Sequence, residues 1–203
     1  MASPELVDVA SVEGLIYVPD FITVAEEDAL ADCLDQGTWD TELKRRVQQW
    51  GFRYSYLDKR LDDSMRVGPI PDWMDFVCQR LTSGGYFDAR PDQAIANEYL
   101  PGQGISAHID CMPCFGDRIG GISLLSDCIM DFTRPDGSQK CSVVLAARSL
   151  VVMTKESRYG WCHAIPARKS DVIGGVQRPR FRRISLTLRN AIVSRPDTED
   201  EGD

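Results

Sequence analysis

The feature that most constrains the fold is a series of short apolar segments of β type in the second half of the chain. Each segment is rich in Val, Ile and Leu and is bounded by turn residues such as Pro135-Asp136-Gly137. The segments expected to form strands are QAIANEYL, RIGGISLL, DCIMDF, SVVLA, SLVVMT, DVIGGV and RRISLTLRNAIV. Short strands linked by tight turns predict antiparallel pairing, so we expect a double antiparallel sheet of the jelly-roll type.

Two helices are expected before these strands. Residues 14–23, GLIYVPDFIT, are typical of a strand that leads into a helix. Thr23 and Glu26 have the spacing of a capping box, and Gly37 is expected to end that helix. A second helix is expected to begin at Asp72 and to end at the next glycine pair. The chain is therefore predicted to have an α+β fold in which N-terminal helices buttress the sheets.

The length of 203 residues suits one domain with a sizeable core. We expect that domain to span residues 1–195, with its β core at about 90–193. The last eight residues, 196–203, contain five acids and no base, and are expected to form a disordered tail.

The net charge of −8 is unevenly distributed along the chain. Residues 1–43 hold eleven acids and no Lys or Arg. Residues 44–195 hold all 23 basic residues and 15 acids, a formal charge of +8. A polyanion is able to dock on such a section although the whole chain is acidic, but a charge excess often only solvates a surface.

Cysteine usage and the chain start predict a reducing, intracellular setting. Seven cysteines is an odd number without framework spacing, and the N-terminus has no basic segment of the secretory kind. No apolar run approaches the roughly 20 residues that span a bilayer. We expect a monomeric protein of the cytoplasm that does not enter a membrane.

Cys111-Met112-Pro113-Cys114 has the C-x-x-C spacing that binds zinc or cycles between thiols and a disulfide. A structural zinc site requires a second such pair, and the sequence contains none. We therefore expect ordinary loop cysteines, with redox or zinc use as the alternative.

The chain has only two histidines, and His108 stands two residues before Asp110. On a strand, residues two apart face the same side, so the imidazole and the carboxylate are expected to point together into a barrel. His163 is the one histidine that remains to complete a site with two histidines and one carboxylate, which is typical of non-haem Fe(II). The same spacing also arises by chance, so a packed or surface histidine is the alternative.

Arg183, Ser185, Thr187 and Arg189 lie on one face of the last expected strand. Two arginines on one face suit a small dicarboxylate such as 2-oxoglutarate, because Arg binds carboxylates with a fork of donors. The alternative is an edge strand that carries Arg to prevent pairing with another chain.

These residues form an ordered series that resembles the AlkB family of Fe(II)/2-oxoglutarate-dependent dioxygenases. The resemblance runs from about Arg45 to Asn190. Its motifs are, in order, Asn97-x-Tyr99, Pro101-Gly102-x-Gly104, His108-x-Asp110, Ser157-Arg158, His163 and Arg183-x5-Arg189. The segments PGQGISAHID, SLLSDCIMDFTRPDG and LVVMTKESRYGWCHAI are similar to the branch that contains the tRNA wobble-uridine hydroxylases.

The resemblance implies a double-stranded β-helix (jelly-roll) core with Fe(II) bound by His108, Asp110 and His163, and O2 as cosubstrate. It also implies a 2-oxoglutarate site. Arg183 would pair with the distal carboxylate, with Tyr99 beside it. The metal-proximal end would be held by Asn97 and Arg189, and Ser185 would complete the cofactor-binding set.

The resemblance further implies a nucleotide-recognition lid at about residues 39–70. Its expected substrate-binding residues are Arg45, Arg46, Gln49, Trp50, Tyr54 and Tyr56. Aromatic and Arg side chains suit stacking on an extruded base and contact with phosphate, although an amphipathic strand with inward aromatics has the same composition. Met112 stands where many repair members place an acid that addresses the base, so it is expected to face the substrate.

The function implied is Fe(II)/2-oxoglutarate-dependent oxidative demethylation of alkylated bases in DNA or RNA, with single-stranded or damaged nucleic acid favoured. One alternative is hydroxylation of a modified tRNA wobble uridine, and another is oxidation of a protein or small molecule. A binding module without catalysis is the alternative of a different class. The complete set of metal ligands and arginines argues against it.

Overall fold

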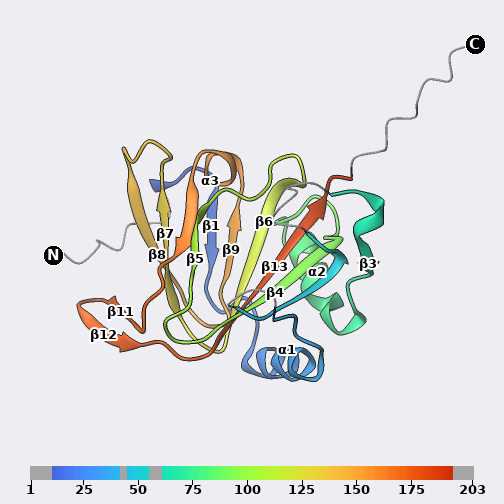
Figure 1. Cartoon of the computed structure of the whole chain (residues 1–203), viewed down its shortest axis with the longest axis horizontal. Coiled ribbons are helices and arrows are strands. Elements are labelled where there is room, and N and C mark those ends of the chain that lie inside the picture. Colours follow the sequence, from blue (N-terminus) through green and yellow to red (C-terminus); the bar gives the residue numbers. More distant parts are fainter. Residues whose placement is uncertain (1–10, 42–44, 55–60, 194–203) are drawn as a thin grey trace, which may run out of the picture.

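The computed structural model describes residues 11–41, 45–54 and 61–193. The expected acidic tail and Tyr56 lie outside these residues. Two antiparallel sheets face each other, and helices cover the outer side of the larger sheet (Figure 1). The expected jelly-roll architecture with buttressing helices is confirmed.

The larger sheet has seven strands in the order β1-β9-β6-β13-β4-β2-β3. Every pairing in it is antiparallel, so strands far apart in the sequence lie side by side. The strands are β1 (Leu15–Val18), β2 (Val47–Phe52), β3 (Arg66–Gly68), β4 (Gln93–Tyr99), β6 (Phe115–Leu124), β9 (Leu150–Met153) and β13 (Arg183–Ala191). Strand β13 lies at the centre between β6 and β4, and none of its residues is exposed.

The smaller sheet has four strands in the order β5-β10-β7-β8. Its strands are β5 (Ile105–His108), β7 (Cys128–Thr133), β8 (Lys140–Leu145) and β10 (Cys162–Ile165). The turn predicted at Pro135-Asp136-Gly137 joins β7 to β8, and Gly137 adopts a φ of 74° there.

The prediction of one strand is wrong. DVIGGV does not form a single strand but parts of two, β11 (Ser170–Ile173) and β12 (Val176–Pro179), which make a separate hairpin. Gly174 and Gly175 form its turn, both with positive φ, which a strand interior excludes.

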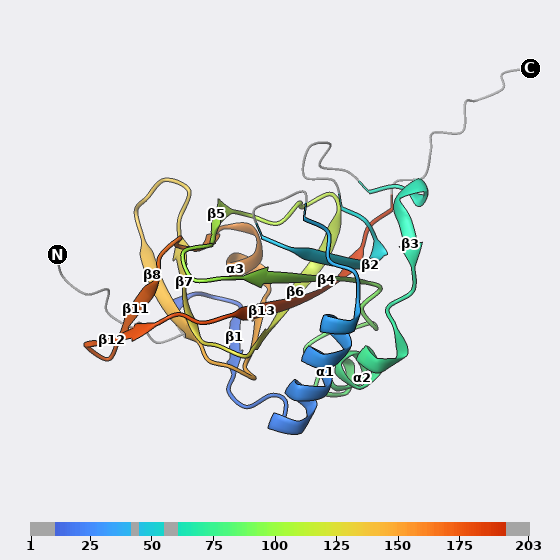
Figure 2. The same ribbon diagram turned by 60° about the horizontal axis from the view of Figure 1, so that its bottom comes forward.

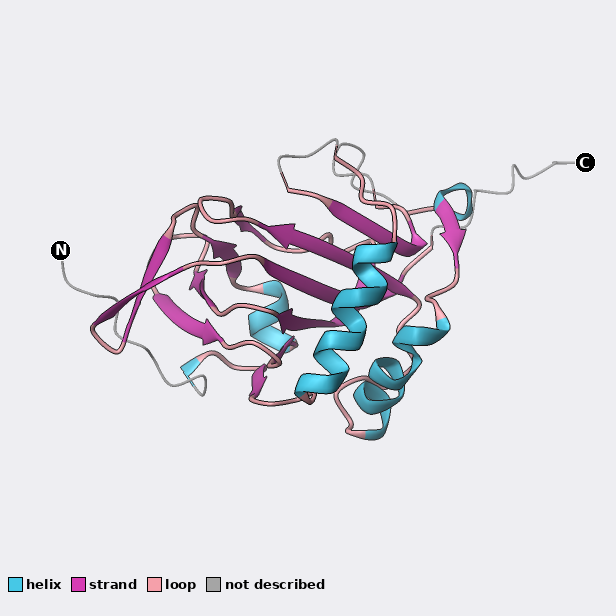
Figure 3. Ribbon diagram, turned by 90° about the horizontal axis from the view of Figure 1, so that it is seen from below, coloured by secondary structure: helices cyan, strands magenta, loops and turns pink. Residues whose placement is uncertain are grey.

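Helices α1 (Val24–Gln36) and α2 (Asp75–Ser83) lie together on one face of the larger sheet, as Figures 2 and 3 show from two sides. The predicted capping box is confirmed, since Thr23 and Glu26 exchange both hydrogen bonds and Gly37 follows the last turn. A third helix, α3 (Lys155–Tyr159), was not expected. Single 3-10 turns occur at Asp63–Met65 and Asp72–Met74.

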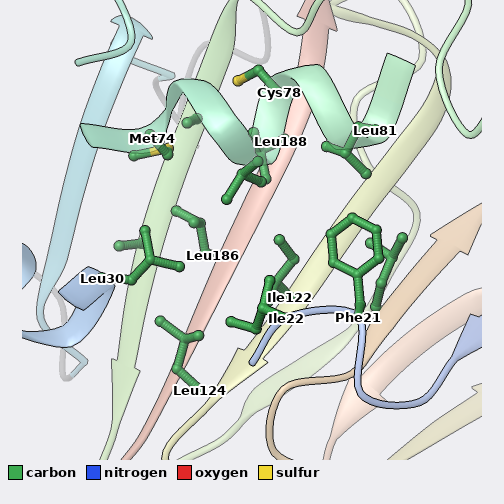
Figure 4. Close-up of a cluster of buried hydrophobic side chains, with 14 of the residues drawn as sticks. Phe21, Ile22, Leu30, Met74, Cys78, Leu81, Ile122, Leu124, Leu186 and Leu188 are labelled. Atoms are coloured by element: carbon green, nitrogen blue, oxygen red, sulfur yellow. The ribbon is translucent and has the colours of Figure 1, made fainter. Parts of the chain in front are cut away.

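The core between the helices and the larger sheet is apolar. Met74, Cys78 and Leu81 belong to one cluster of buried side chains with Leu186 and Leu188 of β13 (Figure 4). All five of these side chains are fully buried, and each buried Leu or Met contributes about 1.5–3 kcal/mol. This packing holds the outer face of β13, so its other face is free to line the space between the sheets.

The segment predicted as a lid contributes two strands to the larger sheet. Residues Val47–Trp50 of β2 pair with Ala94–Asn97 of β4, and Val47 and Phe52 are buried. These ladder hydrogen bonds join the β2 part of the segment to the larger sheet, and its role as a nucleotide-recognition lid stays a prediction. No helix that the structure describes has the length and apolar character required to cross a bilayer.

Candidate metal centre and cofactor cavity

A cavity of about 530 Å³ lies between the two sheets. Its size is within the range of about 300–1,000 Å³ that is usual for small-molecule sites. The larger sheet contributes inward side chains of β4 and β13, and the smaller sheet contributes those of β5 and β10. Apolar side chains such as Met130, Leu145 and Val151 cover much of the remaining wall.

At one end of the cavity three potential metal ligands converge. One ligand atom from each of His108, Asp110 and His163 lies within 4.8 Å of the others. His108 Nε2 is 3.4 Å from Asp110 Oδ1, and the two imidazole centroids are 4.3 Å apart. The structure thus brings together the two histidines and the carboxylate that the sequence predicted.

Strand pairing produces this convergence. His108 and His163 are direct partners in the β5–β10 ladder, so their side chains share one face of the smaller sheet. Asp110 had been expected on the same strand as His108, but β5 ends at His108 and Asp110 lies beyond it. The Nδ1 of His108 donates to the carbonyl oxygen of Ser106 at 2.7 Å, which leaves Nε2 as the ligand atom.

The electrostatics suit a cation. Burial raises the pKa of Asp110, but the charge of Arg189, the hydrogen bond with His108 and the interactions with both imidazoles together outweigh it and hold that pKa well below its usual range. Burial lowers the pKa of His163 to about 4. An ionised carboxylate beside a neutral imidazole is the state that binds a metal ion.

Arg189 holds Asp110 in place. Its Nε donates to Asp110 Oδ2 at 3.1 Å, and its Nη1 donates to Gln93 Oε1 at 3.3 Å. The guanidinium also lies 4.4 Å from the Phe115 ring centroid. Arg189 therefore contacts one carboxylate oxygen of Asp110, Oδ2, whereas His108 lies near the other, Oδ1.

Arg183 carries donors that the protein leaves unused. The residue is only 3% exposed, and its Nη2 donates to Ser123 Oγ at 2.8 Å. Its Nε and Nη1 are buried and have no hydrogen-bond partner among the described residues. Buried donors without partners are costly, so this guanidinium suits an anionic group of a bound molecule. The residues present therefore fit the distal carboxylate of 2-oxoglutarate.

The other predicted cofactor residues also line the cavity. Asn97, Tyr99 and Ser185 face it from β4 and β13, where Ser185 is the direct partner of Asn97. Asn97 Oδ1 accepts from Arg45 Nε at 2.9 Å, and Arg183 lies 5.7 Å from the Tyr99 ring centroid. Thr187 also lines the cavity.

A comparison with known proteins identifies the superfamily. The model of the 2OG-Fe(II) oxygenase superfamily matches residues 14–189, most of the chain. The chain belongs to this superfamily. The two histidines and the aspartate of this oxygenase are thus a candidate iron site, and its cofactors are Fe(II) and 2-oxoglutarate with O2.

Two relatives confirm the resemblance to AlkB proteins. The oxygenase is 35% identical over 202 residues to the "Alkylated DNA repair protein ALKBH8 homolog" of Arabidopsis thaliana, with 88% of this chain and 58% of that protein covered. It is 41% identical over 169 residues to "tRNA (carboxymethyluridine(34)-5-O)-methyltransferase ALKBH8" of Macaca fascicularis, with 79% and 25% covered. The chain thus spans between a quarter and three fifths of the length of these relatives.

A solved structure supports the fold. OsALKBH1 superposes with a TM-score of 0.65 at 17% identity, covering 87% of the oxygenase and 96% of that chain. At this identity the similarity concerns the architecture alone.

Some of the predicted substrate residues line the cavity and others do not. Tyr54 lines the cavity, and its ring lies 5.3 Å from that of Phe115. Arg46 instead forms an ion pair with Glu98, with Nε and Oε2 2.5 Å apart, and stacks on Trp39. Arg46 is therefore not directed into the cavity.

Gln49 and Trp50 lie at a second hollow of about 370 Å³, where Trp50 packs edge-on against Trp73 at 5.6 Å. Met112 is 51% exposed and does not line the cavity. None of these three residues lines the cavity, and their assignment to substrate binding stays a prediction.

Cys111 and Cys114 form a disulfide, whereas ordinary loop cysteines were expected. The turn that follows Asp110 brings their Cα atoms to 5.2 Å, which suits a disulfide. Two further residues of the site, Ser123 and Ser106, escaped sequence reasoning. Their roles depend on a cross-strand neighbour and on a backbone carbonyl, and neither gives a sequence signal.

Proposed function

We propose that this chain is an Fe(II)- and 2-oxoglutarate-dependent dioxygenase that oxidatively demethylates alkylated bases in DNA or RNA. One observation carries the proposal: a cavity with a two-histidine, one-carboxylate cluster at one end also contains the unsatisfied donors of Arg183. The residue roles that follow are part of this proposal.

Each part of the cavity has a task in that reaction. When bound, Fe(II), 2-oxoglutarate and O2 would supply the oxidation: 2-oxoglutarate would lose CO2 and take up one oxygen atom of O2 to become succinate, and the other oxygen atom would enter a C–H bond of the substrate. His108, Asp110 and His163 hold the ion, and Arg189 orients the Asp110 carboxylate. Arg183 binds the distal carboxylate, and the apolar wall excludes water.

Nucleic acid is favoured as substrate by three observations. The relatives carry names for alkylated DNA repair and for tRNA modification. Residues 44–195 have a formal charge of +8, which suits a polyanion. Arg45 and Tyr54 line the cavity, and an Arg with an aromatic ring suits a phosphate and an extruded base.

Hydroxylation of a tRNA uridine is the second candidate, favoured by the 41% identity to the tRNA-modifying relative. The chemistry of the site is the same in both cases. A methyl group on nitrogen is hydroxylated and then leaves as formaldehyde, whereas a hydroxyl group added to carbon stays.

Product masses distinguish the candidates. The protein is incubated with Fe(II), 2-oxoglutarate and a panel of methylated oligonucleotides and tRNA, and each product is analysed by mass spectrometry. We expect loss of one methyl group from an alkylated base. Gain of one oxygen on tRNA supports the second candidate instead. Succinate formation without change in any nucleic acid contradicts both and favours a protein or small molecule.

Tyr54→Ala is expected to raise the KM for a methylated oligonucleotide about 5- to 100-fold, since stacking on a base contributes about 1–3 kcal/mol. Slow 2-oxoglutarate turnover without nucleic acid should persist. The sequence predicted that Trp50 also stacks on the base, and Trp50→Ala tests that prediction. A larger effect for Trp50→Ala than for Tyr54→Ala contradicts the assignment to Tyr54.

The remaining expectations are parts of the proposal. These are a single catalytic domain over residues 1–195, action as a monomer, and a cytoplasmic location. Size-exclusion chromatography with light scattering tests the monomeric state, and the mass of a dimer would contradict it.

A further inference from the structure

We propose that Arg158 is a positioning residue for the metal centre, which it serves by clamping the segment that carries Asp110. The inference rests on the proposed iron site. Arg158 contacts neither the cavity nor the three expected ligands through their side chains, so its action is indirect.

The guanidinium of Arg158 donates to four backbone carbonyls of one segment. Nη1 donates to the oxygen of Asp110 at 2.9 Å, and Nε donates to that of Gly116 at 3.2 Å. Nη2 donates to the oxygens of Cys111 and Phe115, each at 3.3 Å. A single side chain thereby holds both ends of the turn 110–116.

Arg158 is unusual as a buried cation. It is 2% exposed, and the hydrogen bonds of its guanidinium to described residues all go to backbone carbonyls rather than to carboxylates. Burial lowers the pKa of Arg158, while the charge of Asp110 opposes that effect. Burying a cation is costly unless its donors are satisfied, and here carbonyl oxygens of the Asp110 segment satisfy them.

The position of Arg158 in the chain links the two ligand-bearing segments. It lies on α3, which leads directly into β10 and His163. Thr154 caps α3 and also binds Gly14, with its backbone and its hydroxyl donating to the Gly14 oxygen. The Ser157 amide donates to the Glu13 oxygen. The helix is therefore anchored to the two residues that lead into β1, which fixes the backbone position from which the Arg158 side chain extends.

Two arginines hold different parts of Asp110. Arg189 contacts the carboxylate of Asp110, whereas Arg158 contacts its backbone. The Cys111–Cys114 disulfide closes the same turn from within. Only the planar fork of Arg reaches carbonyls in several directions at once, so Lys is not an equivalent replacement.

The test compares Arg158→Lys with Arg118→Lys. Arg118 is a matched control, because it also donates to two backbone carbonyls, those of Gly85 and Tyr86, but at another turn. Co(II) replaces Fe(II) as the probe and is titrated without 2-oxoglutarate, with visible absorption recording affinity and ligand geometry. Thermal unfolding is followed for each variant with and without saturating Co(II).

Arg158→Lys is expected to weaken Co(II) binding about 10- to 100-fold, as loss of a group that orients a ligand does, and to shift the absorption bands. Its metal-induced rise in Tm should be smaller than that of wild type. Arg118→Lys should lower the metal-free Tm but bind Co(II) with wild-type affinity. If Arg158→Lys does not fold, Arg158→Gln is measured in the same way, with the same expectation.

Wild-type affinity and bands in the Arg158 variant overturn the inference, as does an equal loss of affinity in Arg118→Lys. His108→Ala separates this failure from failure of the iron site. If His108→Ala binds Co(II) like wild type, the proposed site itself is wrong. If His108→Ala does not bind Co(II) while Arg158→Lys binds it with wild-type affinity, only the positioning role of Arg158 is wrong.

Discussion

His108→Ala is expected to abolish metal-dependent succinate formation. His108 Nε2 faces Asp110 at 3.4 Å, and its other ring nitrogen is fixed by the Ser106 carbonyl, so no rearrangement replaces the lost ligand. The chain contains only one other histidine, His163, which is already part of the cluster. Losing a ligand should weaken metal binding by more than the roughly 10- to 100-fold that follows loss of an orienting partner. Succinate is measured by mass spectrometry, and Co(II) binding by visible absorption.

Two further variants make the result specific. Asp110→Asn keeps the shape of the side chain but removes its charge, and should also lose succinate formation. Asp28→Asn makes the same chemical change at an exposed position on α1 and should leave activity as in wild type. Undiminished turnover in His108→Ala would remove this residue from the metal centre.

Arg183→Gln is expected to raise the KM for 2-oxoglutarate about 30-fold or more. A buried Arg–carboxylate pair that loses one partner costs about 2–5 kcal/mol, and each 1.4 kcal/mol is a factor of ten. Because Arg183 is directed at the distal carboxylate rather than at the reacting centre, kcat at saturation should fall less than KM rises. Initial rates of succinate formation over a range of 2-oxoglutarate concentrations measure both constants.

A matched control lies on the exposed hairpin. Arg178→Gln changes an exposed guanidinium that forms an ion pair with Asp127 at 3.8 Å, and it should leave both constants unchanged. If Arg183→Gln has the wild-type KM, the unsatisfied donors of Arg183 do not bind the cofactor. Equal falls in activity for Arg183→Gln and Arg178→Gln would indicate a general loss of folded protein.

Local patterns predicted much of this fold. The capping box at Thr23 and the strand around Leu186 depend on neighbours a few residues away, so spacing alone reveals them. The metal ligands were predictable for a different reason, since a chain with two histidines leaves a single way to complete the cluster. The prediction of a single strand at DVIGGV was wrong. The composition of the segment suits a strand, but its paired glycines permit the positive φ of a hairpin turn.

By itself the sequence determined the jelly-roll class, the ligand types at the metal end and the face of β13 that carries Arg183 and Arg189. These follow from periodicity and from the chemistry of single residues. Only the tertiary structure decided that Trp50 lies against Trp73, that Tyr54 lines the cavity and that Arg158 clamps the Asp110 segment. Such contacts join residues far apart in the chain, and they depend on which strands pair and in which register, which no local pattern encodes.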